Sequence, residues 1–237
     1  MFFLPALLHT QGESVIIILR RNIMNIVFLG DSITDAHRDR ADERRPFALG
    51  MGYPLLTASV LGEKYPDRDL RFWNRGISGD KVTDLLSRWR RDCVHMEPDV
   101  LVLFVGINDV WHEDETGNGT DLDVFSEVYK ILLDKAYEAN ENLKVILIEP
   151  FCIGGFGVVK DSWPHKVYLE TREIRKLAED YMVDAVIPAQ DLFDEAIKVG
   201  GPGHWTIDGV HPHPAGHMLL AKAVIEELEK MMAEEEI

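Results

Sequence analysis

A serine near the start of this sequence and a histidine near its end carry the side chains that nucleophilic catalysis needs. Ser32 belongs to the run Gly30-Asp31-Ser32-Ile33-Thr34, which directly follows the apolar segment 25–29. That segment predicts a buried strand. Open α/β sheets place their chemistry in the turn after such a strand. A serine hydroxyl becomes a nucleophile only beside a base and a site for the developing oxyanion. Ser32 is therefore a candidate nucleophile whose partners must come from elsewhere in the chain.

The run Asp208-Gly209-Val210-His211 supplies a candidate base. An unperturbed imidazole titrates near neutrality and can take a proton from a serine hydroxyl. The Asp208 carboxylate, three residues earlier, can reach Nδ1 of His211 if the chain turns between them. Gly209 permits such a turn because glycine tolerates backbone conformations that other residues avoid. One short loop can thus hold both the base and the carboxylate that orients it.

Four blocks occur in a fixed order and together resemble the SGNH hydrolase superfamily, also called the GDSL family. They are Gly30-Asp31-Ser32-Ile33-Thr34, Asn74-Arg75-Gly76-Ile77-Ser78-Gly79-Asp80, Gly106-Ile107-Asn108-Asp109 and Asp208-Gly209-Val210-His211. The resemblance extends from about Met24 to the C-terminal helix. It implies that Ser32 is the nucleophile, His211 the base and Asp208 its orienting partner. It also implies an oxyanion hole formed by the Ser32 and Gly79 backbone N–H groups and the Asn108 side-chain amide.

The residue types suit the roles that the resemblance assigns. Gly79 fits a position where the backbone must approach a substrate closely. Asn108 offers a neutral donor, and loss of one such donor typically removes ~3 kcal/mol of transition-state stabilisation. Taken singly, each residue also fits a plainer role: Ser32 as a helix N-cap, Gly79 as a turn glycine, and Asn108 as the cap of a loop or helix.

Strand-like and helix-like segments alternate along the chain, which predicts a three-layer α/β/α sandwich. We expect a five-stranded, mostly parallel, flavodoxin-like sheet, with Val100–Val105 as a central strand because it is continuously apolar. The predicted strands are Asn25–Leu29, Leu70–Asn74, Val100–Val105, Lys144–Glu149 and Asp184–Ile187. The predicted helices are Tyr53–Tyr65, Lys81–Met96, Asp121–Asn140, Trp163–Met182 and Pro212–Met232. We expect one hydrolase domain over residues 24–237.

Residues 1–23 differ from the rest and form a separate N-terminal extension. Met1–Leu8 and Val15–Leu19 are apolar, but neither run is long enough to span a bilayer. The segment lacks an early basic region and a convincing small-residue cleavage site, so it does not favour a secretory signal. Two interpretations stay open. Translation starts at Met24 and the upstream residues are not native, or Val15–Leu19 forms an extra strand or a subunit arm.

Composition excludes several functions. The net charge of −16 argues against non-specific binding to nucleic acid or to an anionic membrane. The two cysteines, Cys93 and Cys152, lack a C-x-x-C spacing. They therefore suggest free thiols, buried or partly buried, in a reducing compartment. We expect a cytoplasmic protein that acts on a small-molecule or oligosaccharide ester, with no nucleic-acid or membrane partner and with a homo-oligomer left open.

The finer resemblance is to bacterial carbohydrate acetylesterases, especially acetyl-xylan-esterase-like proteins. It rests on the longer stretches 30–35, 74–79, 106–111 and 212–218. Trp111 and Trp205 are candidate pocket walls, each with packing under a loop as the alternative, and Asp31 is a third candidate pocket residue. The resemblance implies hydrolysis of short acyl esters, in particular of acetyl groups on carbohydrate, through an acyl-enzyme and without a cofactor. A thioesterase or lysophospholipase and a catalytically silent α/β binding protein are the alternatives.

A metal site is the rival chemistry. His211, His213 and His217 lie close together in the sequence, and His213 and His217 are spaced i, i+4 on a predicted helix. Such a spacing can bind zinc. However, Pro212 and Pro214 fit the start of a helix, and the segment resembles the last helix of SGNH hydrolases. We therefore expect no metal.

Overall fold

The computed structural model describes residues 23–42 and 45–234. These residues are organised around one parallel sheet. Its five strands are β1 (Ile23–Gly30), β2 (Asp69–Asn74), β3 (Val100–Phe104), β4 (Lys144–Ile148) and β5 (Ala185–Ile187). They are ordered β2-β1-β3-β4-β5, and every neighbouring pair is parallel. This is the flavodoxin-like order. The predicted α/β/α sandwich is therefore confirmed, and each predicted strand is present with an end shifted by at most two residues.

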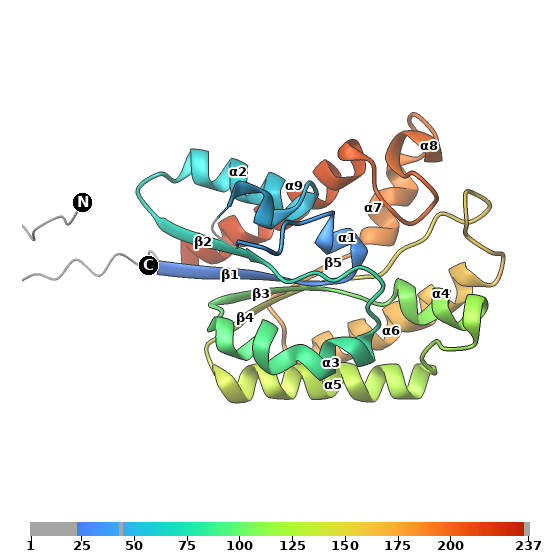
Figure 1. Ribbon diagram of the computed structural model, residues 1–237, viewed down its shortest axis with the longest axis horizontal. Helices are drawn as coiled ribbons and strands as arrows, with labels where there is room; N and C mark the ends of the chain where they lie inside the picture. The colour runs from blue at the N-terminus through green and yellow to red at the C-terminus, as the bar shows by residue number, and fades with distance from the viewer. Residues whose placement is uncertain (1–22, 43–44, 235–237) are drawn as a thin grey trace, which may run out of the picture.

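Helices cover both faces of the sheet (Figure 1). On one face lie α2 (Tyr53–Lys64), α9 (Pro214–Glu234) and α7 (Ala189–Ala196), and on the other lie α3 (Val82–Asp92), α5 (Leu122–Ala139) and α6 (Trp163–Tyr181). Successive side chains of a strand point to opposite faces, so Phe28 packs in the first layer and Val27 in the second. All five residues of β3 are buried, which explains its unbroken apolar sequence.

The helices depart from the sequence prediction in three places. The predicted helix over Lys81–Met96 ends at Asp92, and a 3-10 helix follows at Val94–Met96. The predicted helix from Pro212 starts at Pro214 instead, so His213 precedes it. Four short helices were not predicted: α1 (Ser32–Asp35), α4 (Ile107–Thr116), α7 and α8 (Pro202–Trp205). Each is too short to show a clear helical period in its apolar residues.

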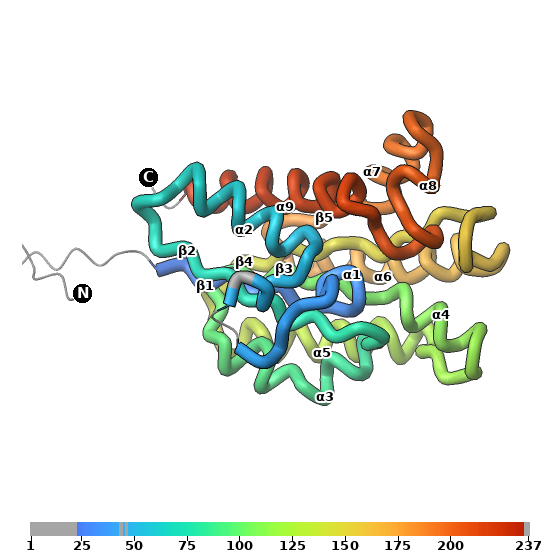
Figure 2. Tube along the Cα trace, turned by 45° about the horizontal axis from the view of Figure 1, so that its top comes forward, coloured from blue at the N-terminus to red at the C-terminus, as the bar shows by residue number. Residues whose placement is uncertain are grey.

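The segments that follow β1 and β3 lie together at one end of the sheet (Figures 1 and 2). Gly30, the last residue of β1, pairs with Phe104, the last residue of β3. A Cβ atom at Gly30 would lie 2.2 Å from the carbonyl oxygen of Phe104. Only glycine therefore lets the chain leave β1 so close to β3. The turn that carries Ser32 begins at this close approach.

Several sequence expectations concern the chain ends, the cysteines and the membrane. Met1–Leu8 and Val15–Leu19 lie outside the described residues, while Met24 is buried within β1. Cys93 and Cys152 are free and buried, as predicted, and burial raises the pKa of each thiol to about 12. Over residues 23–42 and 45–234, none of the helices combines the length and apolarity that a bilayer-spanning segment requires.

Candidate active site

Ser32 and His211 meet although 179 positions separate them in sequence. Ser32 is the first residue of α1, directly after the end of β1. Its Oγ lies 2.9 Å from Nε2 of His211, which is hydrogen-bond distance. The Asp31 side chain caps α1 by accepting from the N–H of Ile33 at 2.9 Å. Asp31 thus makes the N-terminal cap and leaves the Ser32 hydroxyl directed at the imidazole.

Asp208 holds His211 through its side chain and its backbone. Oδ2 of Asp208 lies 2.8 Å from Nδ1 of His211, and Oδ1 accepts from the backbone N–H of His211 at 2.8 Å. Oδ1 also accepts from the N–H of Val210 at 3.0 Å. Burial favours the neutral acid, but these hydrogen bonds outweigh it and lower the pKa of the Asp208 carboxyl below its usual value. Asp208 is therefore ionised at neutral pH, which fixes the proton of His211 on Nδ1 and leaves Nε2 to accept from Ser32.

The loop between β4 and α6 supports the turn that carries Asp208 and His211. The N–H of Ile153 donates to the carbonyl of Gly209 at 2.8 Å, and the N–H of Val158 donates to the carbonyl of Asp208 at 2.9 Å. Gly209 has φ of +92°, as expected for the predicted turn. The glycine-rich stretch 154–157 belongs to this supporting loop. It therefore flanks the candidate active site.

The three candidate oxyanion donors come from the segments that follow β1, β2 and β3, at the same end of the sheet. The N–H groups of Ser32 and Gly79 donate no hydrogen bond to another residue in the part of the chain that the structure describes. Gly79 has φ of +88°, and the space where a side chain would stand is open. Asn108 is buried in the first turn of α4, and its amide donates to the carbonyl of Asp80 at 3.1 Å. That bond fixes the amide beside the segment that carries Gly79.

Asp35 and Asn74 position the segment 74–80, and the sequence indicated no role for either. The buried Oδ2 of Asp35 accepts from the N–H and the hydroxyl of Ser78, both at 3.0 Å, and from Arg40. Asn74 accepts from the N–H of Gly76 at 2.8 Å and donates to the carbonyl of Thr34 at 2.6 Å. Both residues lie in the blocks that carry the family resemblance, and that is the only sequence signal that marks them.

The three candidate pocket residues occupy different environments. The half-buried ring of Trp111 lies 5.8 Å from the His211 ring and 5.1 Å from that of Trp163, measured between centroids. Trp205 donates from its indole N–H to the carbonyl of Val199 and packs on the edge of the core, which agrees with the plainer interpretation. Asp31 is only 1% exposed. Its side chain is therefore not positioned to line an open pocket.

The three histidines do not converge on one point. His217 is buried and its Nδ1 accepts from the backbone N–H of Tyr53 at 3.3 Å. Burial lowers the pKa of His217 to about 4, so its ring is neutral at pH 7. Both nitrogens of His211 are engaged by Ser32 and Asp208. Within residues 23–42 and 45–234, no three His, Cys, Asp or Glu side chains are arranged to hold a metal ion.

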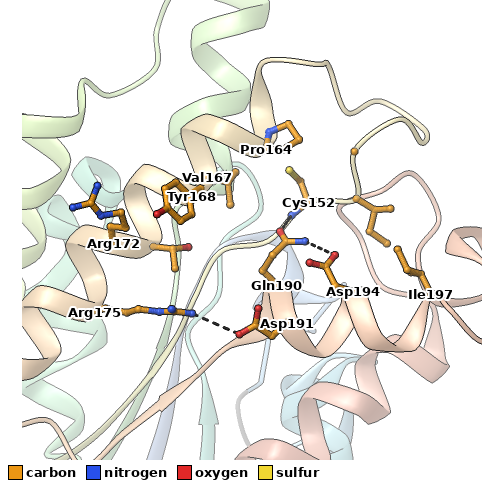
Figure 3. A pocket seen from close by; sticks show the side chains of 13 residues that line it. Cys152, Pro164, Val167, Tyr168, Arg172, Arg175, Gln190, Asp191, Asp194 and Ile197 are labelled. Atoms are coloured by element: carbon orange, nitrogen blue, oxygen red, sulfur yellow. Dashed lines mark hydrogen bonds and ion pairs between the residues drawn. The ribbon is translucent and has the colours of Figure 1, made fainter.

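A cavity of about 440 Å³ lies beside the supporting loop, between α6 and α7 (Figure 3). Its walls include Cys152, Tyr168, Arg175 and Gln190. The side chain of Gln190, on α7, accepts a hydrogen bond from the N–H of Cys152 at 3.1 Å. None of the candidate catalytic or oxyanion residues lines it. The cavity is therefore separate from the candidate reacting groups.

The parallel sheet carries a serine, a histidine and an aspartate in hydrogen-bond contact at its carboxyl edge, which is the type of arrangement that serine hydrolases use. The model of the GDSL-like Lipase/Acylhydrolase family matches residues 28–219. The chain belongs to this family, as the sequence blocks predicted, and it is a carboxylic ester hydrolase.

Three similar proteins cover nearly the whole described chain. An acetylxylan esterase from Geobacillus stearothermophilus is 34% identical over 206 residues, covering 86% of this chain and 93% of the relative. The solved structure of a putative GDSL-like lipase from Parabacteroides merdae has a TM-score of 0.82 at 36% identity, covering 87% of this chain and 97% of that one. The structure of Axe2, an acetylxylan esterase from G. stearothermophilus, has a TM-score of 0.78 at 32% identity, covering 86% and 93%. Two solved Axe2 variants, one with a serine and one with a histidine replaced by alanine, are described as catalytic mutants.

Proposed function

We propose that this protein is a serine esterase that removes acetyl groups from carbohydrate. The observation that carries the proposal is the continuous path from Ser32 Oγ to His211 Nε2 at 2.9 Å and from His211 Nδ1 to Asp208 Oδ2 at 2.8 Å. Together with the family membership, it supports a mechanism in which the serine is acylated and water then hydrolyses the acyl-serine ester.

The first half-reaction transfers the acetyl group to the enzyme. Ser32 Oγ attacks the ester carbonyl carbon while its proton passes to Nε2 of His211. The carbonyl oxygen becomes an oxyanion, and the N–H groups of Ser32 and Gly79 and the Asn108 amide stabilise it. The tetrahedral intermediate collapses, the bond to the sugar oxygen breaks, and His211 returns the proton to that oxygen. The products are a free sugar hydroxyl and acetyl-Ser32.

The second half-reaction uses water in place of the sugar alcohol. His211 removes a proton from water, and the resulting hydroxide attacks the acetyl carbonyl in the same oxyanion site. Collapse breaks the bond to Ser32 Oγ, which regains its proton from His211. Acetate leaves and the enzyme returns to its starting state. Asp208, ionised throughout, stabilises the imidazolium that forms in each half-reaction.

Trp111 supports the preference for a short acyl group. Its indole ring packs between His211 and Trp163, so a bulky apolar wall stands next to the base. A wall in this position leaves room for a methyl group and obstructs a long alkyl chain. The relation to an esterase that acts on acetylxylan points to the same acyl group and to a carbohydrate alcohol.

The test is a comparison of substrates with the purified protein. We expect acetate release from acetylated xylo-oligosaccharides, and faster hydrolysis of nitrophenyl acetate than of nitrophenyl octanoate. Inactivity on the acetylated oligosaccharides together with faster octanoate hydrolysis would contradict the proposal. Those results would favour the thioesterase or lysophospholipase alternative.

A further inference from the structure

Arg88 is a buried cation that connects the loops of the candidate active site. It lies on α3, and its side chain is only 7% exposed. An arginine placed this deeply requires hydrogen-bond acceptors for its guanidinium group. Four are present: Oδ2 of Asp80 at 2.6 Å, the carbonyl of Arg75 at 2.7 Å, the carbonyl of Gly30 at 3.0 Å and Oδ2 of Asp92 at 3.0 Å.

Three of these four acceptors belong to the turns that carry the proposed oxyanion donors. Gly30 lies two residues before Ser32, whose N–H is the first donor. Arg75 and Asp80 bracket the segment that contains Gly79, whose N–H is the second donor. The carbonyl of Asp80 also accepts from the Asn108 amide at 3.1 Å, which positions the third donor. One guanidinium group therefore connects the three segments that carry the three donors.

We propose that Arg88 is a positioning residue that holds the oxyanion site in its active geometry. The proposal rests on the proposed esterase function and adds a residue that does not touch the substrate. The planar guanidinium can serve acceptors in several directions at once, whereas the lysine ammonium is a compact point charge on a flexible stem. Arg88→Lys keeps the charge and loses this geometry. This substitution therefore distinguishes a role of Arg88 in positioning the three segments from a role that needs only its positive charge.

The primary experiment compares Arg88→Lys with wild type on nitrophenyl acetate. Misplacing reacting groups by about 1 Å can lower a rate by roughly a hundredfold. We expect kcat to fall by about tenfold to a hundredfold with little change in KM, because the oxyanion site binds the transition state more strongly than the ester. A wild-type kcat for Arg88→Lys would overturn the proposal. A loss that appears in KM alone would also overturn it.

Arg175→Lys is the control because Arg175, like Arg88, donates from its guanidinium group to a buried carboxylate. Arg175 donates to both oxygens of Glu149, at 2.5 and 3.0 Å, and Glu149 is fully buried. No candidate catalytic residue contacts this pair. We expect Arg175→Lys to lower thermal stability while kcat stays within about twofold of wild type. An equal loss of kcat in both variants would assign the effect of Arg88 to general destabilisation and overturn the proposal.

A double-mutant cycle with Asn108→Ala tests whether both residues act through the same site. In wild type, Asn108→Ala should lower kcat by about a hundredfold or more. In the Arg88→Lys background the same change should cost a smaller factor, since the amide is already misplaced there. Equal factors in the two backgrounds would show that Arg88 acts independently of the oxyanion site.

Hydrogen exchange provides a readout that does not depend on catalysis. In Arg88→Lys we expect faster amide exchange over residues 75–80, and unchanged exchange in β4 and α6. Uniformly faster exchange would indicate global destabilisation and contradict a local role. If the wild type hydrolyses no ester, the proposed function fails, whereas the exchange pattern still tests what Arg88 holds in place.

Discussion

The indole ring of Trp111 lies 5.8 Å from the imidazole of His211, on the side where the ring of Trp163 also packs. This relationship connects a bulky apolar residue of α4 to the proposed catalytic base. The sequence placed Trp111 three positions after Asn108, and the structure places it beside His211. We propose that an acyl chain attached to Ser32 extends toward these rings.

Trp111→Ala should broaden the acyl preference. One methylene changes binding by only about 1–3 kcal/mol, so acetyl and propionyl esters should differ modestly in wild type, while octanoyl esters should be poor substrates. Removing the indole should raise kcat/KM for octanoyl esters relative to acetyl esters. Trp111→Phe serves as the conservative control and should keep most of the wild-type preference. An unchanged acyl profile in Trp111→Ala would show that this ring does not limit the pocket.

Asn108→Ala should act on the transition state. The amide stabilises charge that develops only after attack, so kcat should fall by about a hundredfold or more while KM changes little. Steady-state kinetics on nitrophenyl acetate measure both constants. Asn140→Ala is a suitable control because Asn140 also donates from its amide to a backbone carbonyl, that of Pro98, at the opposite end of α5 from the site. A change confined to KM would assign Asn108 to substrate binding.

The raised pKa of the buried Asp31 carboxyl predicts that the protein loses stability as the pH rises from about 4 to 7. Burial raises the pKa of the Asp31 carboxyl to about 7, against the hydrogen bond from Ile33 and with the nearby Asp109 carboxylate adding to the rise. The folded state therefore binds a proton that the unfolded state releases near pH 4. This contribution is fully present below the unfolded pKa and is lost as the pH rises through about 7.

Urea unfolding between pH 4 and 8 measures this effect. In Asp31→Asn the Oδ1 acceptor for Ile33 is retained and the titrating group is removed. We expect the variant to show a shallower decline of unfolding free energy across this range, since one titrating group contributes at most about 1.4 kcal/mol per pH unit. Parallel curves for wild type and Asp31→Asn would contradict the assignment of the raised pKa to Asp31.

Activity should survive exhaustive chelation of divalent metals. The reason is geometric: both ring nitrogens of His211 have protein partners, and Nδ1 of His217 accepts from the Tyr53 N–H. Dialysis against a strong chelator, followed by assay on nitrophenyl acetate, should give the starting rate. A loss of activity that zinc restores would revive the histidine cluster as a metal site.

Strands β1, β3 and β4 were predictable because each contains an unbroken apolar run, and β3 is apolar on both faces. The short helix α4 could not be predicted, because Ile107 and Val110 are its only buried apolar residues and the segment 112–116 is polar. The sequence therefore left Asn108 in a loop, whereas the structure places it in the first turn of a helix.

The supporting contacts of the site could not be predicted from sequence. Arg88 lies on α3, a helix that the sequence predicted without any indication that an arginine in it is buried. Its partners include backbone carbonyls of Gly30 and Arg75, and carbonyls carry no sequence signal. Asp31 was a candidate pocket residue because it adjoins Ser32. Its burial depends on how β1 and β3 converge, which local sequence does not show.

The most direct test of the central claim is acetate release by Ser32→Ala from acetylated xylo-oligosaccharides. Ser87→Ala is the matched control, since Ser87 is an exposed serine whose hydroxyl donates to the backbone carbonyl of Asp84. We expect Ser32→Ala to lose several orders of magnitude in kcat with an unchanged thermal midpoint, and Ser87→Ala to match wild type. Turnover by Ser32→Ala near the wild-type rate would contradict the assignment of Ser32 as the nucleophile.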